Sequence, residues 1–122
     1  MSSAGPVQVA EIYAGLDAAC VAIGREPATM ARSAMVGALV GRDAAEVRAR
    51  EAALLDAFGA DAPGDDWLEE RRDRWVIGTP DEARAMVRRF VEAGADRIML
   101  QDFLPRDLDM IDVMGEALIG QV

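Results

Sequence analysis

Residues 75–105 constrain the fold most, because they predict one helix leading into one buried strand. Thr79 is followed by Pro80 and, three residues after the cap, by Glu82, which is a capping box with proline at the first helical position. Gly94 ends the predicted helix at a position that favours positive φ. Apolar residues recur between them at helical spacing. They are Ala83, Met86, Val87, Phe90 and Val91.

The predicted strand covers residues 97–101 and has an apolar centre at residues 98–100. An unbroken apolar centre is typical of a strand covered on both faces, which usually lies in a parallel sheet under helices. We expect Phe90 and Ile98 to be core residues. Gln101 and Asp102 then form a polar turn, the place where α/β proteins bind their ligands. This turn is therefore the first candidate binding site.

Upstream of this stretch the pattern predicts a helix, a strand and a second helix. Residues 7–23 predict an amphipathic helix, and residues 33–40 form a continuous apolar run of strand length. Asp43 with Glu46 is another capping box, and its helix is expected to end near Phe58. The stripe expected on the first helix is Val9, Ile12, Leu16, Ala19 and Ile23.

The remaining segments complete one α/β domain over residues 1–122. Residues 59–74 have the composition of a loop or linker, in which the charged part is a short helix or a turn. Residues 75–77 are either a short strand or a buried linker. A last helix is expected over residues 106–119, with Leu108, Ile111, Met114 and Leu118 as its stripe. The expected order is helix, strand, helix, loop, helix, strand, helix, with parallel strands.

Composition excludes several classes of protein. The 122 residues carry a net charge of −9, which argues against a nucleic-acid surface. Hydrophobic residues make up 52%, yet no apolar run reaches the ~18 residues that a membrane span needs. Residues 1–6 are short and polar, so no secretory signal is expected. A single cysteine cannot form an internal disulfide, and this favours a cytoplasmic location.

The inventory of chemical groups is mostly negative. The chain has no histidine, which excludes Ser-His-Asp and Cys-His catalysis and the usual zinc sites, and no metal site is expected. We expect Cys20 to be a small buried hydrophobe. Gly37, inside the first strand, marks either tight packing or the approach of a ligand or backbone. Gly78 and Thr79 offer backbone N–H groups at a helix start, which suits a phosphate, although two carboxylates follow directly.

Three motifs carry a resemblance to a known family. GTPDEA at residues 78–83, EAGADRIMLQ at 92–101 and FLPRDLDMID at 103–112 resemble the C-terminal end of the luciferase-like monooxygenases. The likeness extends back through residues 16–41 and is greatest to the deazaflavin-dependent branch. It implies a flavin- or deazaflavin-dependent oxidoreductase on a (β/α)8 (TIM) barrel. Such a barrel needs about 250 residues, so this chain resembles only its last third.

The resemblance implies FMN or a deazaflavin coenzyme as cofactor, with Gln101 and Asp102 beside its ring and Gly78 and Thr79 as further candidates. No catalytic residue carries over, so the chain alone is expected to be inactive. The alternative function is a non-catalytic α/β oligomerisation module. Two strands cannot cover themselves, so we expect a homodimer or a complex with the missing upstream part of the barrel. The expected interface contains residues 33–40 or 97–101.

Overall fold

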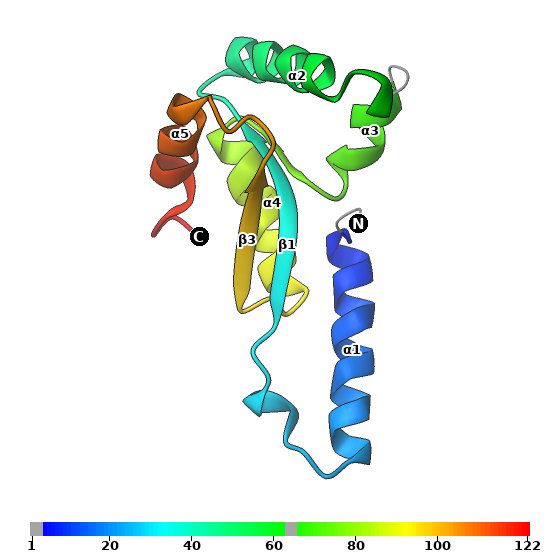
Figure 1. Cartoon of the computed structure of the whole chain (residues 1–122). Coiled ribbons are helices and arrows are strands. Elements are labelled where there is room, and N and C mark those ends of the chain that lie inside the picture. The colour runs from blue at the N-terminus through cyan, green and yellow to red at the C-terminus, as the bar shows by residue number, and fades with distance from the viewer. Residues whose placement is uncertain (1–3, 63–65) are drawn as a thin grey trace.

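The structure, a computed structural model, describes residues 4–62 and 66–122 and is mixed α/β. This described part contains five helices and a three-stranded parallel sheet (Figure 1). The elements in chain order are α1 Pro6–Ala22, β1 Ser33–Val40, α2 Ala44–Phe58, α3 Asp66–Arg72, β2 Val76–Gly78, α4 Pro80–Glu92, β3 Arg97–Asp102 and α5 Leu108–Leu118. Short 3-10 turns lie at Pro27–Thr29 and Gly59–Asp61.

The sheet has the order β2-β1-β3, and both pairings are parallel, as predicted. The register sets Ala38 opposite Val76 on one side and opposite Asp102 on the other. The chain therefore passes from β2 over β1 to reach β3, and the strand order reverses at β1. A (β/α)8 barrel runs its strands in sequence around a closed ring. A partial barrel is thus not confirmed, and the order is that of an open, doubly wound sheet.

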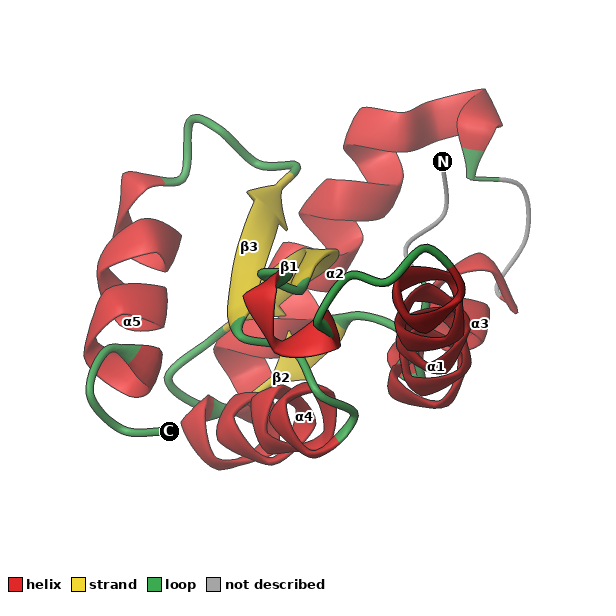
Figure 2. Ribbon diagram, turned by 90° about the horizontal axis from the view of Figure 1, so that it is seen from below, coloured by secondary structure: helices red, strands yellow, loops and turns green. Residues whose placement is uncertain are grey.

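Helices α4 and α5 pack together and cover one face of the sheet. Phe90 of α4 and Met110 of α5 are both 0% exposed, and they meet the equally buried Val36 and Val40 of β1. The prediction that Phe90 is a core residue is confirmed. Seen from below, α5 and α1 lie to either side of the sheet (Figure 2).

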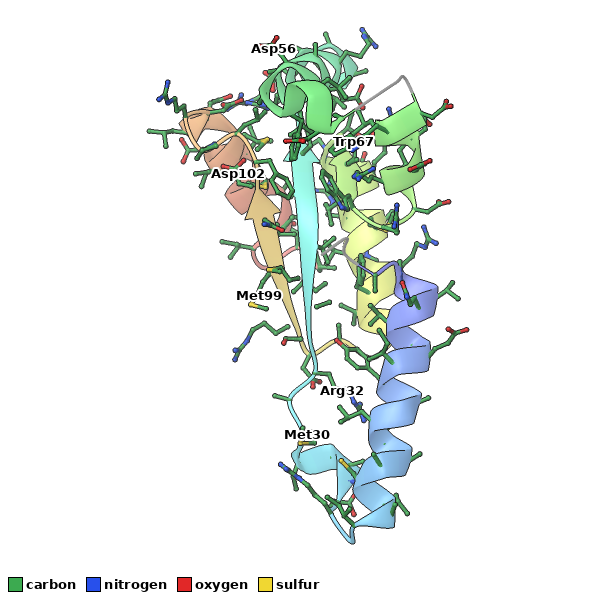
Figure 3. All side chains as sticks on the ribbon, turned by 45° about the vertical axis from the view of Figure 1, so that its right-hand side comes forward. Met30, Arg32, Asp56, Trp67, Met99 and Asp102 are labelled. Carbon is green, nitrogen blue, oxygen red and sulfur yellow. The ribbon has the colours of Figure 1, made fainter. Side chains whose placement is uncertain are left out.

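The other face of the sheet is partly open. Met35 and Met99 are register partners on β1 and β3, and they are 54% and 45% exposed. Met99 points away from the sheet in Figure 3. Ile98 is only half-buried against the core. The expectation that β3 is covered on both faces is wrong, because β3 is an edge strand with helices on one face only.

The structure decides two segments whose secondary structure the sequence left open. Residues 59–74 are not only loop, since they contain the 3-10 turn and helix α3, while residues 63–65 lie outside the described part. Residues 75–77 are not a linker, because β2 begins at Val76 and pairs with β1. Both segments are short, so their periodicity is too brief to identify an element.

The stripes of the first and last helices also differ from expectation. Helix α1 buries Val9, Tyr13 and Cys20, while Ile12 and Ile23 are 54% and 78% exposed. Helix α5 buries Met110, Val113, Met114 and Ala117, and it exposes Leu108 and Ile111. Both helices are apolar on more than one side, so the periodicity alone did not select the buried side. In α4, by contrast, only Val91 of the expected stripe is exposed.

Candidate functional site

The carboxyl edge of the sheet, where β1 and β3 end side by side, is the candidate site. The strand order reverses here, and open α/β sheets bind ligands in the crevice at such a point. Gln101 and Asp102 are the last two residues of β3 and do not form a turn after it, and both are half-buried. Asp102 is labelled at this end of the strand in Figure 3. The backbone N–H of Leu104 donates to Asp102 Oδ1 at 2.7 Å, which orders the turn after the strand. The structure therefore sets both residues at a rigid edge.

A shallow groove of about 320 Å3 opens beside this turn, between α2 and the segment that joins β3 to α5. Its volume is at the lower end of the roughly 300–1,000 Å3 of ligand pockets. The groove is lined by Ala53, Ala57, Phe103, Leu104, Pro105, Arg106 and Asp107. Arg106 is exposed, and within the described part of the chain no ion pair of its guanidinium is found. An apolar floor with one cation at its rim suits a planar anionic ligand.

Gly78 lies at the end of β2 and Thr79 directly follows it, and β2 is on the other side of β1 from β3. Gly78 is opposite Val40, so β1 separates it from β3, and two strand spacings amount to about 10 Å. The Thr79 N–H donates to Glu82 Oε2 at 2.8 Å, as a capping box predicts, and the Thr79 hydroxyl also donates to that oxygen at 3.0 Å. The Glu82 carboxylate thus occupies the helix N-terminus, where it would repel a phosphate. The structure does not bring these two residues together with Gln101 and Asp102.

Sequence reasoning missed an ionic network that joins α2 to α5 at the same edge. It consists of Arg42, Glu46, Arg50, Asp107 and Asp109. Arg50 is buried and donates to the Val40 carbonyl at 2.8 Å and to Asp107 at 2.8 Å. Arg42 donates two hydrogen bonds of 2.6 Å to Asp109. The only local signals were the i, i+4 spacings of Arg42 with Glu46 and of Glu46 with Arg50, and such spacings are common on helices.

The electrostatics of this network are those of a structural clamp. Two guanidinium groups face three carboxylates, so the network carries no spare positive charge for an anion. The hydrogen bonds from Arg42, with those from Arg50, lower the pKa of Asp109 to about 2. Arg50 likewise lowers the pKa of Asp107, whose side chain also caps α5 by accepting from Met110 N–H. Both carboxylates are therefore charged at neutral pH.

An aromatic cluster supports the edge from the partly open face. Trp75 stacks on Phe103 with ring centroids 5.0 Å apart, and Phe58 meets the edge of Phe103 at 5.4 Å. The Trp75 ring lies so close over Gly37 that a Cβ there would overlap it. The alternative of tight packing at Gly37 is thus confirmed, with a side chain as the neighbour. These aromatic residues are far apart in sequence, so no local pattern pointed to the cluster.

The described residues contain few other reactive groups. Cys20 is 4% exposed and free, as expected for a small buried hydrophobe. Within residues 4–62 and 66–122, no three or more metal-binding side chains are grouped closely enough to hold a metal ion. None of the helices in this part has both the length and the apolar character that crossing a bilayer requires.

Comparison with known proteins adds no family assignment. No protein-family model matches the sequence, and no curated protein shows significant similarity to it.

Proposed function

We propose that this chain is part of a luciferase-like, flavin- or deazaflavin-dependent oxidoreductase and that it forms one wall of the cofactor pocket. The observation that carries the proposal is the position of Gln101 and Asp102, half-buried at the carboxyl end of β3 where the strand order reverses. Of the three motifs that resemble the family, residues 92–101 end in Gln101 and residues 103–112 directly follow β3, whereas residues 78–83 join β2 to α4. The single free Cys20 supports a reducing, cytoplasmic location.

The groove beside this turn fits the cofactor in part. Phe103 and Ala57 offer an apolar surface for a ring, and Arg106 offers a cation. Gln101 does not line the groove, but it lies in β3, two residues before Phe103, and its amide can both donate and accept hydrogen bonds. The helix start at Gly78 and Thr79 does not fit a phosphate, because Glu82 fills it. When bound, the cofactor would supply the hydride or oxygen chemistry, and the protein would hold and shield it.

A partial (β/α)8 barrel belongs to the same proposal. The open face of the sheet, with Met35 and Met99, is the face that α4 and α5 do not cover. In a barrel the helices lie outside, so the corresponding face of the sheet points inward. We propose that the upstream part would add its strands at the outer edges of β2 and β3, so that β1 and β3 stay paired and the groove at their ends is kept. Without it the chain has no turnover.

Fluorescence titration of the isolated chain with FMN and with a deazaflavin coenzyme tests this proposal. We expect weak binding of one of them, with Gln101→Ala and Arg106→Gln each lowering affinity about tenfold, or 1.4 kcal/mol. The matched controls are Gln8→Ala and Arg88→Gln, two exposed residues away from the groove, which should leave the affinity unchanged. Absence of binding, equal effects of the controls, or turnover by the chain alone would contradict the proposal.

The second candidate function is a non-catalytic α/β oligomerisation module. It is favoured by the outer edges of β2 and β3, which pair with no strand in the described part of the chain, and by the exposed Met35 and Met99. Central β1 is paired on both sides, so an interface through a strand edge would use β2 or β3. Self-association together with no affinity for either cofactor would favour this function over the first.

A further inference from the structure

Helix α1 has a second apolar side that the chain itself does not cover. Val9, Tyr13 and Cys20 face the core. A neighbouring stripe is left toward solvent, with Ile12 at 54% and Ile23 at 78% exposure. Leu16 in this stripe is half-buried and Ala19 is exposed. The C-terminal half of α1 extends past the end of the sheet, where few other elements lie near it (Figure 1).

The spacing of this stripe is that of a helix–helix seam. Val9, Ile12, Leu16, Ala19 and Ile23 are separated by steps of three, four, three and four residues. This is the a/d pattern of a heptad, in which apolar side chains insert between those of a facing helix. The core uses only Val9 of this set. A surface helix with one apolar stripe needs no such second seam, so the seam indicates a helical partner.

The charges around the seam select the partner. Glu11 and Asp17 are the only charged residues of α1, and Asp17 is paired with Arg32 at 2.6 Å. Although the chain has a net charge of −9, no residue of the seam is charged, so two identical seams can meet without electrostatic repulsion between them. In an antiparallel pair, Ile12 would face Ile23 of the partner subunit. The seam is free of charge, so no charged residue within it opposes this pairing.

We propose that α1 binds α1 of a second copy of this chain, antiparallel about a two-fold axis. Opposed helix dipoles and the closed two-fold symmetry of most homodimers favour this arrangement. It also sets the larger Leu16 against the small Ala19 of the partner subunit. This interface differs from the strand edges and does not depend on the binding of any cofactor.

The size of the seam determines how strong the dimer is. The 17 residues of α1 form a surface about 25 Å long and about 10 Å wide. Such a surface gives an interface at the small end of the range, below about 1,200 Å2 in total, which is typical of weak association. We therefore expect a reversible dimer with a dissociation constant in the micromolar range or above.

Sedimentation velocity of the whole chain over a range of about 5 to 500 µM is the primary test. The sedimentation coefficient should rise with concentration from monomer to dimer. Ile12→Glu and Ile23→Glu should each raise the dissociation constant at least tenfold. Val7→Glu and Val21→Glu are matched controls, because these valines are 72% and 67% exposed on other sides of α1, and they should change it less than twofold. Circular dichroism checks that each variant keeps its helices.

Disulfide trapping then tests the antiparallel arrangement. The variant Cys20→Ala/Ile12→Cys/Ile23→Cys carries two thiols about 16 Å apart along one helix, too far for a link within one chain. Oxidation should give a covalent dimer linked between positions 12 and 23 of different copies.

Three results would overturn the proposal. The first is a monomer at all concentrations, which would leave the seam to another segment or protein. The second is a dimer that Met99→Glu breaks and Ile12→Glu does not, which would put the interface at β3. The third is trapping only between like positions, which would exclude the antiparallel pair.

Discussion

At the scale of residues, Phe90 contributes to stability by packing in the core between α4 and the sheet. Its ring is 0% exposed in the core between α4 and the sheet, whereas Phe103 is half-buried at the carboxyl edge. Phe90→Ala should therefore lower the free energy of unfolding by about 3–5 kcal/mol. Phe103→Ala is the control, because it is the same substitution at a half-buried position, and it should lower the free energy of unfolding clearly less. A loss well under 1 kcal/mol for Phe90→Ala in urea titration would show that this packing is wrong.

Tyr13 is a residue whose polar atom opposes its burial. Its ring is 9% exposed, and no hydrogen-bond partner of its hydroxyl exists among the residues the structure describes. Burial, together with the nearby Asp96, raises the pKa of this phenol. Because an unpaired buried hydroxyl costs about 1–3 kcal/mol, Tyr13→Phe should increase the free energy of unfolding by about 1 kcal/mol. A decrease in urea titration would mean that the hydroxyl has a partner.

At the scale of elements, Arg50 joins α5 to α2 and to the end of β1. Its side chain is 9% exposed, but the carboxylates of Asp107 and Asp109 are 31% and 53% exposed. Arg50→Met should therefore lower the free energy of unfolding by about 1–3 kcal/mol, which is less than the loss expected when a wholly buried ion pair is broken. Arg48→Met, an exposed arginine on the same helix, should have almost no effect. Equal effects of the two substitutions in thermal unfolding would contradict the clamp.

The same clamp makes stability depend on acid pH. Hydrogen bonds from arginine lower the folded pKa of Asp107, and they lower that of Asp109 from 3.8 to about 2. A carboxylate with a lowered folded pKa stabilises the fold fully above its unfolded pKa, and the effect is lost as pH falls through the folded pKa. Urea midpoints should therefore drop between pH 3.8 and about 2. In the double variant Asp107→Asn/Asp109→Asn the drop in urea midpoint should be smaller. An unchanged drop would show that other carboxylates cause it.

At the scale of the whole molecule, the most stable part should be the centre of the sheet. β1 is paired on both sides, and Val36 and Val40 are 0% exposed, whereas α1 packs mainly against the 3-10 turn Pro27–Thr29 and against α4. We expect the amides of β1 to exchange hydrogen only on global unfolding, and those after Leu16 in α1 to exchange by local opening. Hydrogen exchange followed by mass spectrometry at low protein concentration measures this. Equal protection of both segments would contradict this order of stability.

The sequence by itself determined the local elements and the general place of the site. The apolar run Ser33–Val40 became β1 with the expected ends, and the capping box at Thr79 began α4 as predicted. Gly94 has φ 99°, as the end of that helix required. Strands separated by helices predicted a parallel sheet, and a polar turn after a strand predicted Gln101 and Asp102 at its carboxyl edge. Each of these features depends on neighbours along the chain.

Only the tertiary structure decided which surfaces meet. The order β2-β1-β3, the Arg50 network and the stacking of Trp75 on Phe103 join residues from distant parts of the chain, so no local pattern encodes them. The burial of Tyr13 in place of Ile12 has the same cause. Helix α1 is apolar on several sides, and the shape of its neighbours selects among them. Periodicity states that a surface is apolar, whereas packing decides what covers it.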